Sequence, residues 1–183
     1  AINRKPDYVE ALSNLGNLLK EQGMLDAAFT SYKRAIAIKP DYVIAHTNLG
    51  IILQELGRLE EAVEVYNSAI AIKPDHVESL SNLGNALTKQ GHFNSAIASY
   101  QKAIIYKPDY LDAHYNLGNA LKEQSRLDEA VASFNKAIAI KPDMADAHYN
   151  LGNALQEQGR LAAAIGCYQK AIAIKPDFAA ALN

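Results

Sequence analysis

Asparagines recur through this sequence at a fixed interval of 34 residues, in two rows that lie three positions apart. The first row comprises Asn14, Asn48, Asn82, Asn116 and Asn150, and the second comprises Asn17, Asn85, Asn119 and Asn153. Only Ile51 interrupts the second row. An amide carries donors and an acceptor together, so it can pair with the N–H and C=O groups of an extended peptide whatever the peptide's side chains are. The chemistry that these residues suggest is therefore binding.

The prolines have the same period and delimit a repeat. All six stand in Lys-Pro-Asp, and they lie 34 residues apart, at Pro6, Pro40, Pro74, Pro108, Pro142 and Pro176. The phrase AIAIKPD contains four of them, and AIIYKPD contains Pro108. We expect five full repeats, 9–42, 43–76, 77–110, 111–144 and 145–178, with residues 1–8 as the end of a preceding repeat.

Each repeat has two stretches with the spacing of an amphipathic helix. In the repeat that begins at Leu111, apolar residues follow the i, i+4, i+7, i+8 pattern over residues 113–121, and a second apolar stripe covers residues 127–138. Pro142 then ends the second helix. We name these two predicted helices helix A and helix B. Residues 179–183 would begin a sixth helix A.

The helix ends have sequence signals of their own. Asp109 is placed to cap helix A, with Asp112 three residues later in the position of a capping-box acid. The same arrangement recurs in the pairs Asp7 with Glu10 and Asp75 with Glu78. Between the helices, four repeats have a glycine suited to a left-handed C′ residue, at Gly23, Gly57, Gly91 and Gly159. Ser125 departs from this pattern and predicts a small strain or a shifted turn.

These features resemble the tetratricopeptide repeat family over essentially the whole chain. The matching positions are Leu117-Gly118, Leu121, Ala130, Phe134, Ala137 and Pro142, with counterparts such as Leu151-Gly152, Leu155, Ala164, Tyr168, Ala171 and Pro176. The chain has no tryptophan; Leu12, His46, Leu80, His114 and His148 fill the usual first aromatic position. The resemblance implies an all-α fold, a right-handed α-solenoid of helix-turn-helix repeats, with helix A lining a concave groove.

The glycines inside helix A have a structural explanation. Glycine there costs about 0.5–1 kcal/mol relative to alanine, and a close approach of helix B through its small alanines accounts for it. These glycines are Gly16, Gly50, Gly84, Gly118 and Gly152, and the facing alanines are Ala28, Ala62, Ala96, Ala130 and Ala164.

The asparagines are expected to face away from helix B, because helical spacing places them roughly opposite Leu117 and its counterparts. Two interpretations stay open: hydrogen bonds between neighbouring repeats, or bonds to a ligand. Asp112 and Asp146 flank the rows and favour a neutral or basic partner. Tyr115 and Tyr149 could stack on a ligand or cover neighbouring helices.

A closer resemblance sharpens the ligand interpretation. The phrase NLGNALKEQG is similar to the repeats of O-linked N-acetylglucosamine transferases and of many bacterial repeat arrays. In those transferases, asparagines matching the first row hold the backbone of protein substrates. The carboxylate clamp of chaperone-binding members is a weaker match, since only Lys20, Lys89 and Lys122 lie near the end of helix A.

Other classes of site find little support. His46, His114 and His148 lie on separate helices, so they favour core filling over a metal site. Cys167 stands where other repeats have small residues and has no histidine motif beside it. The sequence has no phosphate-binding loop, no dinucleotide glycine motif and no HExxH. We therefore expect no catalytic residue, no metal and no cofactor.

Composition limits the partners and the compartment. A net charge of -2 over 183 residues argues against nucleic acid and anionic membrane. No long apolar run or signal peptide is visible, and one cysteine fits a reducing compartment. These observations favour a cytoplasmic protein without a membrane partner.

The sequence predicts a protein-interaction module that binds an extended peptide or a flexible protein segment in an asparagine-lined groove, as part of a bacterial or archaeal scaffold. One alternative is the substrate-recruiting region of a glycosyltransferase whose catalytic domain would lie beyond Asn183. Another is a self-assembling scaffold, since the chain starts and stops within the repeat and apolar ends could stack end to end.

Overall fold

The computed structural model describes residues 5–176, which form ten α-helices and no strand. The helices in the position of helix A are α1 (Lys5–Glu21), α3 (Val43–Glu55), α5 (Val77–Lys89), α7 (Leu111–Glu123) and α9 (Ala145–Glu157). Those in the position of helix B are α2 (Leu25–Ile38), α4 (Leu59–Ile72), α6 (Phe93–Tyr106), α8 (Leu127–Ile140) and α10 (Leu161–Ile174). The all-α, helix-turn-helix class expected from the sequence is confirmed. The start of a sixth helix A, expected at 179–183, lies outside the described residues.

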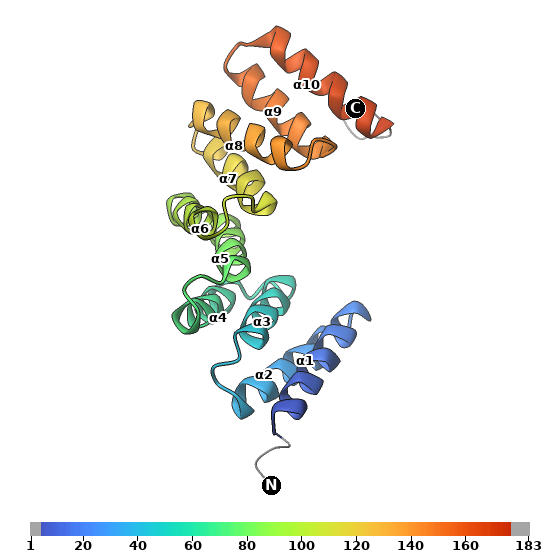
Figure 1. The fold of residues 1–183 in the computed structure, drawn as a ribbon, viewed down its shortest axis with the longest axis vertical. Helices are drawn as coiled ribbons and strands as arrows, with labels where there is room; N and C mark the ends of the chain where they lie inside the picture. The colour runs from blue at the N-terminus through green and yellow to red at the C-terminus, as the bar shows by residue number, and fades with distance from the viewer. Residues whose placement is uncertain (1–4, 177–183) are drawn as a thin grey trace. The chain divides into compact units, whose positions relative to one another are not determined.

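The helices form two compact units, Ala1–His92 with α1–α5 and Phe93–Asn183 with α6–α10. In the first unit α1 packs on α2, α2 on α3, α3 on α4 and α4 on α5 (Figure 1). In the second unit α6 packs on α7, α7 on α8, α8 on α9 and α9 on α10. The A helices also contact one another within each unit, whereas the described parts of the B helices do not. The A helices therefore form one continuous layer in each unit.

A large aromatic ring from helix B fills the core of each repeat. Tyr32, Tyr66 and Phe134 are fully buried, and each lies against a glycine of the paired helix A. A Cβ atom added to Gly50 would lie 2.5 Å from the ring of Tyr66, and one added to Gly118 would lie 2.6 Å from the ring of Phe134. The glycines are thus explained by packing, but the expected partner was wrong. The aromatic rings of helix B, not its small alanines, occupy the space.

The expected aspartate caps are also wrong. Tyr110 and His76 are the N-cap residues of α7 and α5, each one residue after the proposed aspartate. The backbone N–H of Tyr110 donates to the carbonyl of Lys107 at 3.0 Å, so Pro108 and Asp109 are the two central residues of a β-turn. Pro fits the first of these positions, and the turn uses the aspartate before the helix begins. In the first repeat α1 begins at Lys5, so Asp7 lies inside the helix.

The histidines of helix A connect it to this turn. His114 and His148 are buried, and their Nε2 atoms donate to the carbonyls of Pro108 at 2.8 Å and Pro142 at 2.9 Å. His46 makes the same bond to Pro40 at 2.8 Å. Each histidine therefore satisfies a turn carbonyl that no helix bond reaches, and His114 and His148 also fill core positions.

The turn between helices A and B has a left-handed residue in every repeat, including the one without glycine. The expected left-handed conformation is confirmed at Gly23, Gly57, Gly91 and Gly159, with φ between 74° and 77°. Ser125 has φ 55°, and Arg126 N–H still donates to the carbonyl of Leu121 at 2.9 Å. The turn is not shifted, and the serine bears the strain of the left-handed region.

Replacing Ser125 by glycine is therefore expected to raise the free energy of unfolding by about 0.5–1 kcal/mol, since glycine removes the strain and loses part of the gain to chain entropy. Urea denaturation followed by circular dichroism measures the change. Gly57→Ser is the matched reverse variant, because a Cβ at Gly57 would meet nothing within 4 Å. A gain from both substitutions, or from neither, would contradict the explanation by backbone strain.

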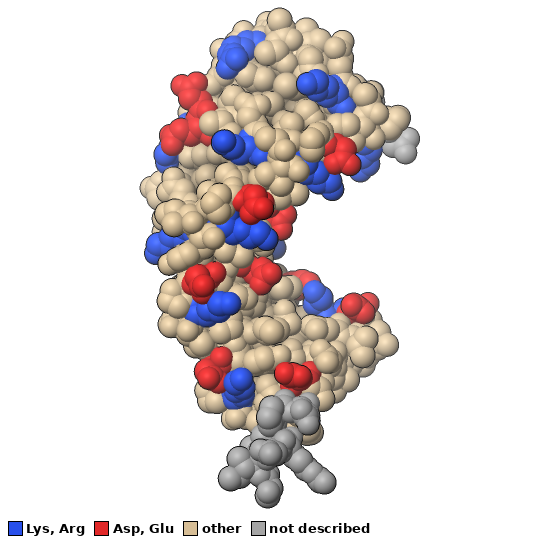
Figure 2. All heavy atoms as spheres, in the orientation of Figure 1, with Lys and Arg blue, Asp and Glu red and all other residues tan. Residues whose placement is uncertain are grey.

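The surface has no concentration of one charge on the face in view, where basic and acidic side chains are interspersed (Figure 2). This agrees with the small net charge of -2. None of the helices in residues 5–176 is long and apolar enough to cross a membrane.

Candidate peptide-binding surface

The asparagine rows follow the layer of A helices within each unit. The first unit carries Asn14 and Asn17 on α1, Asn48 on α3, and Asn82 and Asn85 on α5. The second unit carries Asn116 and Asn119 on α7, and Asn150 and Asn153 on α9. Asn14 is exposed and the others are half-buried. We call these side chains the asparagine rows.

Asparagines of neighbouring repeats bond to each other. In the first unit, Asn48 Nδ2 donates to Asn17 Oδ1 at 3.1 Å. In the second unit, Asn150 Nδ2 donates to Asn119 Oδ1 at 3.1 Å. A first-row amide of one repeat therefore donates to a second-row amide of the repeat before it. Part of the interpretation as bonds between repeats is thus present in the structure.

The second row also bonds to helix B. The hydroxyl of Tyr32 donates to Asn17 Oδ1 at 2.7 Å, and that of Tyr168 donates to Asn153 Oδ1 at 2.9 Å. Burial raises the pKa of Tyr32 to about 12, so its hydroxyl keeps the proton that it donates. The expectation that both rows face away from helix B is therefore wrong for Asn17 and Asn153. A tyrosine hydroxyl at the edge of the core reaches their oxygens.

The interruption at Ile51 has a local replacement. Isoleucine has no polar atom to offer Tyr66, and Gln54, one turn later on α3, takes this role. Gln54 Nε2 donates to the hydroxyl of Tyr66 at 2.8 Å and to the backbone carbonyl of Asn82 at 3.2 Å. The same two functions, satisfying the core tyrosine and reaching the next repeat, are retained with a different side chain.

Phe134 has no hydroxyl, and Tyr115 supplies one from α7. The Tyr115 hydroxyl accepts from Asn150 Nδ2 at 2.9 Å, and burial raises its pKa. Its ring lies 6.1 Å from that of Phe134, and the ring of Tyr149 lies 5.8 Å from that of Tyr168. Both flanking tyrosines thus rest on the core aromatics of helix B and remain half-buried.

Asn48 and Asn150 of the first row have side-chain oxygens that accept no hydrogen bond within the described residues. Asn150 donates its amide N–H groups to Asn119 and Tyr115, and Asn48 donates to Asn17. In the described part of the chain, no donor reaches the side-chain oxygen of Asn48 or Asn150, and Asn14 makes no side-chain hydrogen bond. Fixed amides with open oxygens can accept from the N–H groups of an extended chain. Asp112 and Asp146 are exposed beside them.

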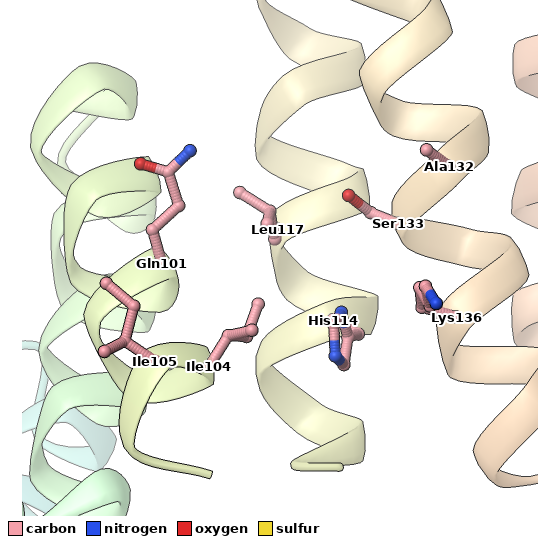
Figure 3. Close-up of a pocket in the computed structure, with 8 residues that line it drawn as sticks. All are labelled: Gln101, Ile104, Ile105, His114, Leu117, Ala132, Ser133 and Lys136. Atoms are coloured by element: carbon pink, nitrogen blue, oxygen red, sulfur yellow. The ribbon is translucent and has the colours of Figure 1, made fainter. Parts of the chain in front are cut away.

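A cleft that the sequence patterns did not predict involves α7 as well. An open cleft of about 470 Å³ lies between α6, α7 and α8 and is lined by Gln101, Ile104, Ile105, His114, Leu117, Ala132, Ser133 and Lys136 (Figure 3). Ile105 is exposed and stands where the other repeats have alanine. The signal was present in the sequence, since AIIYKPD is the one departure from AIAIKPD among the five full repeats.

The residues expected to be inert toward nucleophilic or metal chemistry can be examined one by one. Burial raises the pKa of the Cys167 thiol, which disfavours the nucleophilic thiolate. No group of three histidine, cysteine, aspartate or glutamate side chains within residues 5–176 is placed to hold a metal ion.

Two models of known repeat families match this chain. A model described as TPR repeat matches residues 16–57, 52–91, 84–125 and 118–159, and a tetratricopeptide repeat model matches residues 145–178. None of the curated proteins compared with the chain matches it.

Solved structures show the same fold. The crystal structure of MamA protein is 25% identical with a TM-score of 0.81, over 95% of each chain. YrrB, described as a TPR protein with an unusual peptide-binding site, is 26% identical with a TM-score of 0.76, over 93% of this chain and 88% of its own. PilF of Pseudomonas aeruginosa is 20% identical with a TM-score of 0.84, over 91% and 76%. These likenesses confirm the fold class expected from the sequence.

Proposed function

Because this chain is a protein-interaction module that belongs to the tetratricopeptide repeat family, we propose that it binds an extended peptide or a flexible protein segment along the asparagine rows. The observation that carries this proposal is the state of the first-row amides. Asn48 and Asn150 donate amide N–H groups to the neighbouring repeat, and their side-chain oxygens remain open. The peptide-binding site in the name of YrrB, a structure of similar fold, supports a ligand of the same class.

The fixed amides lower the entropic cost of binding a ligand. An asparagine that must be ordered by its ligand loses side-chain freedom on binding, at about 0.5–1.5 kcal/mol for each immobilised side chain. Asn150 is already held by two hydrogen bonds, at 2.9 and 3.1 Å. Bonds to neighbours and bonds to a ligand are therefore complementary, since the first kind orients the oxygens that the second kind uses.

The charges beside the rows favour a neutral or basic ligand. Glu10, Glu78, Asp112 and Asp146 are all exposed on the A helices close to the asparagines. Exposed carboxylates contribute mainly to selectivity and to the rate of encounter. A ligand rich in lysine or arginine would bind faster at low salt than an acidic one of the same length.

Replacing Asn82, Asn116 and Asn150 together by alanine is expected to weaken peptide binding tenfold or more, since each lost hydrogen bond is worth about 0.5–1.5 kcal/mol. Helicity should stay the same or rise slightly, because alanine is the better helix former. The probe is a peptide selected from a display library of unstructured peptides against the whole chain. Calorimetric titration of that peptide into each variant measures the change.

The matched control carries the same three substitutions on B helices, at the exposed Asn67, Asn94 and Asn135. It should bind like the original chain. Equal affinity of the row variant and the control would sink the proposal. Ile105→Glu separates the two surfaces, because it would weaken a peptide bound in the cleft of α6, α7 and α8 and leave one bound on the asparagine rows unaffected.

A further inference from the structure

The cleft of α6, α7 and α8 has a counterpart one repeat later. An open hollow of about 250 Å³ lies between α8, α9 and α10, in the same compact unit. We call the first the α7 cleft and the second the α9 cleft. Six lining residues of the α9 cleft stand 34 positions after lining residues of the α7 cleft, namely Asn135, Ile138, His148, Leu151, Cys167 and Lys170. The repeat itself therefore forms this hollow, twice in the second unit.

Small side chains on the second helix B of each cleft leave space beside the paired helix A. Ala132 and Ser133 line the α7 cleft from α8. At the same two positions, α4 of the first unit has the larger Glu64 and Val65. In α10, Gly166 stands at the position of Ala132. The B helices of the second unit thus have room between them for a side chain that is not their own.

An exposed isoleucine borders the α7 cleft. Ile105 is 74% exposed, and Tyr106, the next residue, is 52% exposed. Figure 3 shows Ile104 and Ile105 of α6 on one side of the cleft and Lys136 of α8 on the other. Single exposed apolar residues are ordinary on protein surfaces. An exposed isoleucine beside an apolar hollow is instead typical of a site that receives an apolar side chain of a partner.

A lysine stands at the edge of each cleft. Lys136 lines the α7 cleft and Lys170 lines the α9 cleft, and Lys102 on α6 has the same position one repeat earlier. All three are exposed, and the ion pairs within residues 5–176 involve none of them. α6 and α10 have no acidic residue, and those of α8, Asp128 and Glu129, lie in its first turn. The B helices of the second unit therefore present unpaired positive charges beside apolar hollows.

This combination indicates which chemistry fits. The apolar hollows suit side chains better than phosphates, so the lysines favour the carboxylates of a protein over a nucleic acid. The surface also differs in charge from the asparagine rows, where the exposed Asp112 and Asp146 favour a neutral or basic ligand. The linings of the two clefts include no residue of the asparagine rows.

We propose that the α7 and α9 clefts together bind an acidic segment of a partner protein. The segment places a bulky apolar side chain in each cleft and carboxylates beside Lys136 and Lys170. A segment that reaches both clefts binds more tightly than one that reaches a single cleft, because the second contact forms within the complex. This interaction goes beyond binding along the asparagine rows and does not depend on it.

Two display libraries of unstructured peptides, selected against the whole chain, supply the probes. Both libraries fix two bulky apolar residues, leucine or phenylalanine, at varied spacing. The other positions hold aspartate, glutamate, serine and glycine in the acidic library, and lysine, arginine, serine and glycine in the basic library. The acidic library should yield peptides that bind the chain, with an affinity that falls as salt is added.

Replacing Lys136 and Lys170 together by glutamate should weaken binding of the strongest acidic peptide tenfold or more in a calorimetric titration, because two attractive charges become repulsive. Ile105→Glu should also weaken it tenfold or more, since it places a carboxylate beside an apolar cleft. All three side chains are exposed, so circular dichroism should show unchanged helix content. Peptides from the basic library should lose no affinity for the lysine variant.

The matched control reverses two charges elsewhere, at the exposed Lys33 on α2 and Lys89 on α5 of the first unit. It should bind the acidic peptide like the original chain. The variant with alanine at Asn82, Asn116 and Asn150 should do so too, which separates this proposal from the one on the asparagine rows. An acidic library without a binder, equal affinities of the two lysine variants, or a loss confined to the asparagine variant would each overturn the proposal.

Discussion

Replacing Phe134 by alanine is expected to lower the free energy of unfolding by about 3–5 kcal/mol. The ring is fully buried and fills the space between α8 and Gly118 of α7. It also supports the ring of Tyr115, 6.1 Å away. Alanine would leave a cavity beside a helix whose backbone cannot move in to fill it, because α7 also packs on α6 and α9. Urea denaturation followed at the helical circular dichroism band measures the loss.

Lys136→Ala is the control on the same helix. Lys136 is exposed, and such a substitution changes stability by no more than about 0.5 kcal/mol. Because the chain has two compact units, the unfolding curve should be fitted with and without an intermediate. A loss below about 1 kcal/mol for Phe134→Ala would mean that the neighbouring side chains collapse into the space and that the ring is not tightly packed.

Replacing Gly50 by alanine is expected to destabilise the chain by about 1–3 kcal/mol, although alanine is the better helix former. The new Cβ would lie 2.5 Å from Cε1 of Tyr66. That ring is fully buried, and its hydroxyl is held by Gln54 at 2.8 Å. The ring cannot turn away without losing both its packing and this hydrogen bond. Thermal and urea unfolding both report the change.

Replacing Gly166 by alanine is expected to have the opposite effect on the free energy of unfolding. Gly166 lies inside α10, and a Cβ there would meet nothing within 4 Å. Only the helix propensity then matters, so a gain of about 0.5–1 kcal/mol is expected. Two substitutions of the same kind should therefore act with opposite sign. If both stabilised the chain, the close approach of the Tyr66 ring would not be the reason for glycine at position 50.

The local features of the fold could be read from the sequence because they depend on residues close together in the chain. α3, α5, α7 and α9 each begin at the first residue of a predicted repeat. The glycine turns follow from one backbone requirement, and at Ser125 the turn overrides the residue's preference. The family resemblance and the fold class rest on these same short-range signals and were confirmed.

Contacts between elements could not be read in this way. The pairing of Tyr32 with Asn17 joins two helices, and nothing in the spacing of either residue indicates a hydrogen bond between them. The predicted aspartate caps were wrong for a related reason. Asp109 is a good capping residue, but together with Pro108 it forms the centre of a β-turn. Whether the aspartate caps the helix or forms the turn depends on which of these two local motifs is the more stable. Which atoms of the asparagine rows stay open also depends on such contacts.

The bonds between repeats bear on how such a chain can change its length in evolution. Asn48 donates to Asn17 across a repeat boundary, and Asn150 donates to Asn119 in the same way. Loss of residues 43–76 as a block would bring Asn82 into the place of Asn48, with Asn17 still present as its acceptor. The loss of a whole repeat therefore keeps donor and acceptor matched wherever the repeat before the new junction has its second-row asparagine, as at Asn17, but not where that repeat has Ile51, and a deletion that is not a whole number of repeats breaks the pairing. Selection can thus vary the number of repeats at such a junction without redesigning this contact.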